Sequence, residues 1–179
     1  MRSVGSRMRA GWSMRPRGGA VMMFFQDAQF PRCASVIRLR IVGGKLSERV
    51  RSALLECIES DALGTKALSA GTYPRVNIVK LVSNGVWDRR VGGLYSGDCD
   101  PADLNKVFVN WNVAQDLERY NAPYNARNFE RTLLHEVVHW GRKIAGKSGT
   151  IGGIEAGDVF EFKAGYTKFQ GDHDDRACP

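Results

Sequence analysis

Two of the chain's three histidines, His135 and His139, lie four positions apart in the stretch LLHEVVHWG, and Glu136 directly follows the first of them. At about 100° per residue, a helix brings these histidines to the same side, one turn apart, so both imidazoles can bind one metal ion. Glu136 projects about 100° away from His135, near enough to contact a metal-bound water without being a ligand. The spacing therefore predicts a zinc site in which Glu136 is the general base.

Zinc peptidases use this geometry in their His-Glu-x-x-His helix, so the predicted reaction is hydrolysis of peptide bonds. Glu136 would take a proton from the attacking water and pass it to the leaving amine. Tyr166 and Arg142 are the candidates for stabilising the oxyanion. Outside the enzymes, the alternative is a non-catalytic, metal-stabilised binding module. Glu136 argues against that module, because a closed structural site has no use for a base.

A hydrolytic zinc site needs a third protein ligand. If the stretch GIEAGDVFEFKAGY is helical, Asp158 and Glu161 lie within about 60° of each other and away from the apolar side. We predict Glu161 as the third ligand, with Asp158 as a capping residue or as a partner that orients a ligand. Glu155, which falls nearer the apolar side or before the helix begins, is an alternative ligand, as are Asp158 and His173.

Apolar periodicity predicts the elements that position these residues. Three helices are expected: residues 46–63, with Gly64 as the stop; residues 125–146, with Asn125 as N-cap and Gly146 as the stop; and a short helix from Ala156. Strands are expected at 34–42, 75–82 and 106–113, with Asn84-Gly85 as a turn and 86–95 as a hairpin partner. The strand at 106–113 reads as half-exposed, and its residues 108–113 are the candidate edge for binding an extended peptide.

Composition and charge limit the other classes of function. A chain of 179 residues fits one domain, which we place at residues 31–179. Residues 1–30 are expected to form a flexible basic tail. The sequence does not determine at which methionine translation starts. The net charge of +7 includes five arginines in the first 26 residues, and 21 basic against 19 acidic residues remain. A nucleic-acid partner is therefore not expected. No apolar run reaches the ~20 residues of a membrane span. The four cysteines form no Cys-x-x-Cys pair, and their disulfide state stays open.

The stretch NFERTLLHEVVHWGRK, a short glycine-rich loop and GIEAGDVFEFKAGY together resemble a known family. They are similar to the small metallopeptidase toxin domains of bacterial polymorphic and type VI secretion effectors, some of which are carried by VgrG spike proteins. The likeness spans about residues 75–170. It implies an α+β, zincin-like fold: a small mixed or antiparallel sheet packs on the His-Glu-x-x-His helix, and a second short helix supplies the third ligand.

The same resemblance implies a biological setting. It points to an antibacterial effector that is cytoplasmic before delivery, is then secreted or delivered into a competitor cell, and acts on protein substrates, with the target-cell periplasm as a candidate compartment. It also implies a dedicated immunity protein as partner. The alternative within the enzymes is a housekeeping bacterial zinc peptidase with the same site and no toxic role.

Overall fold

The computed structural model describes residue 24 and residues 26–69, 73–98 and 102–166. The helices are α1 (Pro31–Ser35), the π-helix η1 (Val36–Ile41), α2 (Glu48–Ile58), α3 (Asp61–Ala67), the 3-10 turn η2 (Ser96–Asp98), α4 (Trp111–Tyr120), α5 (Pro123–Ile144) and α6 (Ala156–Ala164). The strands are β1 (Arg75–Val79), β2 (Val82–Ser83), β3 (Val86–Trp87), β4 (Gly93–Tyr95), β5 (Lys106–Asn110), β6 (Thr150–Ile151) and β7 (Ile154–Glu155). The predicted α+β class is confirmed.

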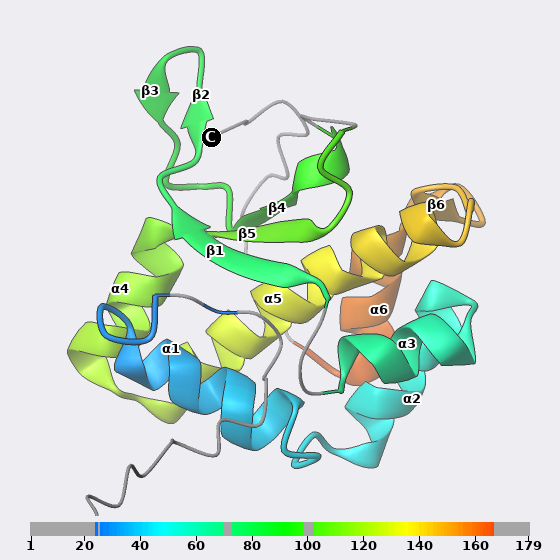
Figure 1. Cartoon of the computed structure of the whole chain (residues 1–179), viewed down its shortest axis with the longest axis horizontal. Coiled ribbons are helices and arrows are strands. Elements are labelled where there is room, and N and C mark those ends of the chain that lie inside the picture. The colour runs from blue at the N-terminus through cyan, green and yellow to red at the C-terminus, as the bar shows by residue number, and fades with distance from the viewer. Residues whose placement is uncertain (1–23, 25, 70–72, 99–101, 167–179) are drawn as a thin grey trace, which may run out of the picture.

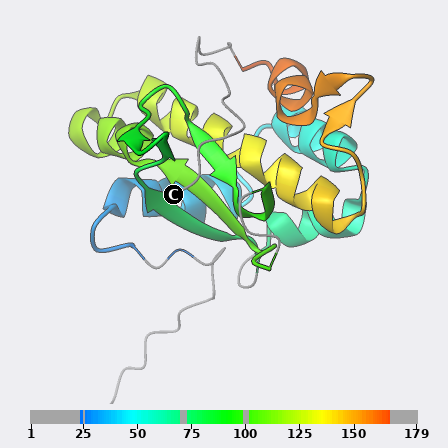
Figure 2. The same cartoon turned by 90° about the horizontal axis from the view of Figure 1, so that it is seen from above.

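The long helix α5 runs through the middle of the molecule (Figure 1). The sheet β1-β5-β4 lies on one side of it, while α2 and α3 pack on another side, as a view from above also shows (Figure 2). β1 and β5 are parallel, and β4 and β5 are antiparallel, so the sheet is mixed. The predicted small sheet on the histidine helix is therefore confirmed.

β5 is the central strand of this sheet, so both of its edges are already hydrogen-bonded to neighbours. The prediction that residues 108–113 offer a free edge to a substrate is therefore wrong. The strand also ends at Asn110, because the chain turns into α4 at Trp111. Residues 107–110 are all buried, which a half-exposed strand would not be. In the part of the chain that the structure describes, β1 and β4 form the outer edges of the sheet.

Residues 34–42 are helical, not a strand as predicted. Pro31 starts α1 at its first position, where its fixed φ suits a helix. Val36, Ile37 and Ile41 are buried, whereas Leu39 is 54% exposed. A strand would have buried Leu39 together with Ile37 and Ile41, so the alternation of residue types in this segment was a misleading signal.

The predicted helix at 46–63 forms, but in two parts. Ser47 caps the start of α2, and Glu59 ends it in the left-handed conformation, with φ of 56°. Gly64, the predicted stop, lies within α3 instead. A Cβ at Gly64 would collide with the Leu55 side chain, so this glycine allows α3 to pack closely on α2.

The predicted helix around the histidines begins at Pro123, two residues before Asn125. The Asn125 side chain donates to the carbonyl oxygen of Asp116 at 3.0 Å and caps nothing on α5. At the other end, Gly146 has a φ of 68° just after the helix, so the predicted stop is confirmed. The Asn84-Gly85 turn between β2 and β3 is confirmed as well, whereas residues 86–95 divide between β3 and β4.

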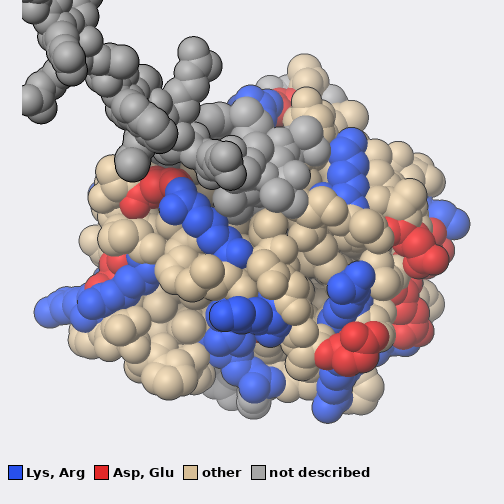
Figure 3. Space-filling view, turned by 60° about the horizontal axis from the view of Figure 1, so that its bottom comes forward, with Lys and Arg blue, Asp and Glu red and all other residues tan. Residues whose placement is uncertain are grey.

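The division of the chain at residue 30 stays a prediction, and residues 1–23 and 25 lie outside the described part. Phe24 forms a bridge to Val76, and the Gln26 side chain both donates to and accepts from the backbone of Ile78. Within the described residues, none of the helices has the length and apolar character needed to cross a bilayer. On the face seen in Figure 3, basic and acidic side chains are interspersed.

The described cysteines, Cys33 and Cys57, are buried and free. Burial raises the pKa of the Cys57 thiol to about 11 and also raises the pKa of Cys33. Both are therefore thiols, not reactive thiolates, at neutral pH. Cys99 and Cys178 lie outside the described residues.

Candidate metal centre

His135, Glu136 and His139 lie in the middle of α5, where the sheet, α2 and α6 all contact this helix. The helix is buried on several sides, and its buried apolar residues include Leu134, Val137 and Trp140. The His135 side chain is 3% exposed and that of His139 is 18% exposed. The two ring centroids are 5.2 Å apart, so the predicted convergence of both histidines is present in the fold.

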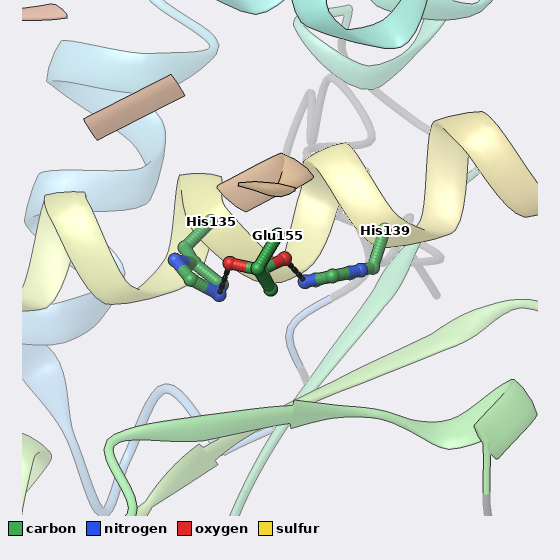
Figure 4. A group of neighbouring side chains, drawn as sticks. All are labelled: His135, His139 and Glu155. Carbon is green, nitrogen blue, oxygen red and sulfur yellow. Dashed lines mark ion pairs between the residues drawn. The ribbon is translucent and has the colours of Figure 1, made fainter. Parts of the chain in front are cut away.

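Glu155 lies between the two imidazole rings (Figure 4). Its Oε1 is 2.5 Å from Nε2 of His139, and its Oε2 is 3.4 Å from Nε2 of His135. This glutamate ends β7 and is also the N-cap of α6, because its carboxylate accepts from the backbone N–H groups of Gly157 and Asp158. Its side chain is 28% exposed.

Glu161, the predicted third ligand, lies on the other side of the His135 ring. Its Oε1 is 3.0 Å from Nδ1 of His135, and its Oε2 accepts from Nη1 of Arg131 at 2.9 Å. This side chain is 3% exposed. It therefore contacts one histidine of the pair and already has a cation as a partner.

The side chains form two groups of potential ligand atoms that lie within 4.8 Å of one another. The first group is His135, His139 and Glu155, and the second is His135, Asp158 and Glu161. The first alone joins both histidines of the motif. His173, the remaining alternative, lies outside the described residues.

The charges at this site shift the pKa values in opposite directions. Burial lowers the pKa of His135, but its hydrogen bond to Glu161 and the charges of the neighbouring carboxylates outweigh burial and raise the pKa to about 9. The pKa of His139 is also raised, since the contact with Glu155 outweighs burial. Burial raises the pKa of Glu155, but His139, His135 and the Gly157 N–H together lower it to about 2. Glu155 is therefore ionised at neutral pH.

Two glycines allow the backbone to approach the site. A Cβ at Gly157 would collide with the His135 ring, and a Cβ at Gly93 would lie 2.8 Å from Oε1 of Glu136. Gly93 is the first residue of the edge strand β4. Glu136 therefore lies directly beside this strand, where it also lines a pocket together with Gly92, Gly93 and polar residues of α4 and α5.

The two candidates for oxyanion stabilisation have other contacts. The hydroxyl of Tyr166 donates to Oε1 of the buried Glu130 at 2.8 Å. The Arg142 guanidinium donates to backbone carbonyls outside α5 and to Glu59. None of these contacts involves the histidine pair.

The chemistry of the first group fits a metal ion. Zinc binds imidazole nitrogen and carboxylate oxygen at about 2.0–2.2 Å, so tetrahedral ligand atoms lie about 3.4 Å apart. The 3.4 Å contact from Glu155 to Nε2 of His135 matches this spacing, whereas the 2.5 Å contact to Nε2 of His139 is a hydrogen bond, so these two groups would have to move apart to bind one ion. Three protein ligands leave one position open, which is the arrangement of catalytic zinc sites.

A local signal for Glu155 did exist in the sequence. The glycine pair Gly152-Gly153 is typical of a tight turn, and Glu155 directly precedes the helix predicted from Ala156. An acidic residue at a helix N-cap directs its oxygens at the first N–H groups. That pattern could identify a cap, but it could not reveal that the cap lies against two histidines.

Residues 26–166 match the model of the family described as metallopeptidase toxin 3. The match begins at Gln26 and ends at Tyr166, so it spans the sheet, the histidine helix and α6. Neither the curated proteins nor the solved structures gave a match.

Proposed function

The chain belongs to the metallopeptidase toxin 3 family, and from that premise we propose that it is a zinc-dependent peptidase. In this proposal His135, His139 and Glu155 hold the ion, and Glu136 is the general base. The observation that carries the proposal is the position of the Glu155 carboxylate between the two Nε2 atoms. Glu155 thus takes the role that periodicity had assigned to Glu161.

Each residue has a distinct task in the proposed reaction. A bound zinc ion supplies Lewis-acid chemistry, which polarises the scissile carbonyl and activates water. The Glu136 carboxylate accepts the proton of the attacking water and passes it to the leaving amine. Glu161 accepts from Nδ1 of His135, which leaves Nε2 free to bind the ion, and the Arg131 guanidinium donates to the other Glu161 oxygen.

The substrate strand is proposed to bind along β4, since β5 has no free edge. An extended peptide bonded to the outer edge of β4 would pass next to Glu136, because Gly93 of that strand adjoins the Glu136 carboxylate. Main-chain hydrogen bonds would then give affinity for many sequences. The pocket beside Glu136 would receive a side chain of the bound peptide.

Replacing Glu136 tests the proposed chemistry. Glu136→Gln should retain about one zinc per chain and lose about 10²–10⁴-fold in kcat on a peptide substrate, because a general base contributes to rate and not to metal binding. Metal content by mass spectrometry and peptide hydrolysis are measured side by side. Glu48→Gln, on the surface of α2, is the matched control and should equal the parent. Zinc loss in Glu136→Gln would make Glu136 a ligand and would overturn the assignment.

We also propose that the protein is an antibacterial effector with a dedicated immunity protein as partner; the family's description as a metallopeptidase toxin supports a toxin that acts on protein. Expression in the periplasm and in the cytoplasm of a test bacterium would separate this role from that of a housekeeping peptidase. We expect growth arrest on export to the periplasm, and none with exported Glu136→Gln. Growth arrest in the cytoplasm alone would contradict the periplasmic target. No arrest in either compartment, with intact hydrolysis in vitro, would favour the housekeeping role.

A further inference from the structure

Arg142 lies three residues after His139 on α5, and its side chain is only 4% exposed. Its Nε donates to the carbonyl oxygen of Ser148 at 2.6 Å, and its Nη2 donates to that of Thr150 at 3.2 Å. Both carbonyls belong to the segment that leads from α5 into the β6–β7 hairpin. Arg142 therefore ties this segment to the helix that carries the histidines.

The remaining contacts of Arg142 reach α2. Its Nη1 donates to the carbonyl oxygen of Cys57 at 2.6 Å and to Oε1 of Glu59 at 2.7 Å. Glu59 ends α2 in the left-handed conformation. One guanidinium thus joins the end of α2, the end of α5 and the start of the hairpin.

The hairpin that carries Glu155 is short, and its other restraints are the packing of Ile151 on the main core, a hydrogen bond from the Ala156 N–H to the Gly149 carbonyl oxygen, and the start of α6 directly after it. β6 and β7 have two residues each, paired as Thr150 with Glu155 and Ile151 with Ile154. A two-stranded hairpin of this size is marginally stable on its own in water. Ile154 is 58% exposed, so burial of this side chain adds little. Thr150, whose carbonyl Arg142 binds, lies directly opposite Glu155.

We propose that Arg142 is a positioning residue for the metal site: its guanidinium fixes the β6–β7 hairpin so that the Glu155 carboxylate stands between the two Nε2 atoms. The inference rests on the proposed function, in which Glu155 is a ligand. In this role Arg142 contacts neither the ion nor the substrate. Because Arg142 already restricts the conformations of the hairpin in the metal-free protein, Glu155 loses less conformational entropy when it binds the metal.

A lysine cannot replace this arginine. The guanidinium presents five N–H donors in a rigid plane, of which Arg142 directs donors to four acceptors. An ammonium group keeps the positive charge but offers three donors at one point and cannot reach four acceptors spread over two segments. Arg142→Lys therefore removes the clamp and preserves the charge.

The test is a double-mutant cycle on zinc affinity, measured by competition with a chromophoric chelator. The four proteins are the full-length parent, Arg142→Lys, Glu155→Gln and the double variant. We expect Arg142→Lys to weaken zinc binding about 10 to 100-fold, as for residues that orient a ligand. In the Glu155→Gln background the same change should have almost no further effect, because the ligand that Arg142 positions is already lost.

Arg49→Lys is the matched control. Arg49 also donates to backbone carbonyls, those of Lys163 at 2.7 Å and Phe162 at 3.5 Å, but these lie at the end of α6 far from Glu155. Its loss should leave zinc affinity within about twofold of the parent. Far-UV circular dichroism on the metal-free proteins checks that each variant is folded.

If Arg142→Lys does not fold, Glu59→Gln weakens the same clamp from its exposed end. Its expected loss of zinc affinity is smaller, up to about fivefold, as for a partly exposed ion pair, and it should also vanish in the Glu155→Gln background.

Equal losses of affinity in both backgrounds, or an Arg49→Lys effect as large as that of Arg142→Lys, would overturn the positioning role. A parent protein that binds no zinc would instead overturn the proposed function. A parent that binds zinc while Glu155→Gln binds it equally well would remove Glu155 from the ligand set. These results are distinguishable from one another.

Discussion

The two nitrogens of the His135 ring meet two glutamates in different surroundings. On the Nε2 side, Glu155 is 28% exposed and its acidic oxygens contact two histidines and the N–H groups of its own helix. On the Nδ1 side, Glu161 is 3% exposed and is paired with the Arg131 guanidinium. Both carboxyls have lowered pKa values, so both are ionised at neutral pH despite burial.

In the proposed site, this difference separates the metal ligand Glu155 from Glu161, which orients a ligand. A zinc ligand must direct a donor atom at the same point as the other ligands, and the Glu155 carboxylate lies against the Nε2 atoms of both histidines. A carboxylate that is paired with an arginine and contacts the Nδ1 side of the ring instead fixes the tautomer and the direction of that imidazole. Charge and residue type are the same in both cases, so the partners decide the role.

The largest effect is expected for Glu155→Gln. The amide oxygen can still cap α6, but it is a weak ligand for zinc, so affinity should fall by more than about 100-fold, beyond the loss caused by removing an orienting partner. Zinc affinity is measured by chelator competition on protein shown to be folded. If this variant kept the zinc affinity of the parent, Glu155 would not be a ligand, and the proposed difference in role between Glu155 and Glu161 would be wrong.

A smaller effect is expected for Glu161→Gln. This change leaves His135 in place but removes the carboxylate that accepts from its Nδ1, so zinc affinity should fall about 10 to 100-fold. Arg131→Met, which removes the cation beside Glu161, is a companion variant that should shift affinity in the same direction. A loss in Glu161→Gln as large as that in Glu155→Gln would restore Glu161 as a ligand.

The smallest effect is expected for Asp158→Asn. Asp158 belongs to the second group of potential ligand atoms, yet it lies in the first turn of α6 and contributes no atom to the group with both histidines. Losing its charge should change zinc affinity no more than about fivefold, as for a partly exposed ionic contact. The same competition assay, run beside the two glutamate variants, measures it. A hundredfold loss would move the metal to the second group.

The sequence by itself determined the features that depend on neighbours along the chain. The approach of His135 and His139 follows from their spacing on a helix, and the stop at Gly146 and the turn at Asn84-Gly85 follow from residues that tolerate positive φ. The short helix from Ala156 and the mixed α+β class also agree with the structure.

The tertiary structure alone decided the strand order and where each glutamate lies. β5 became the central strand because β1 and β4 pair with its two sides, and no local pattern encodes which strands become neighbours. Residues 34–42 had an alternating pattern, yet they pack as a helix. Glu155 lies outside both helices, so a helical wheel could not place it. Its carboxylate meets His135 and His139 of α5 only because the fold brings the start of α6 against that helix.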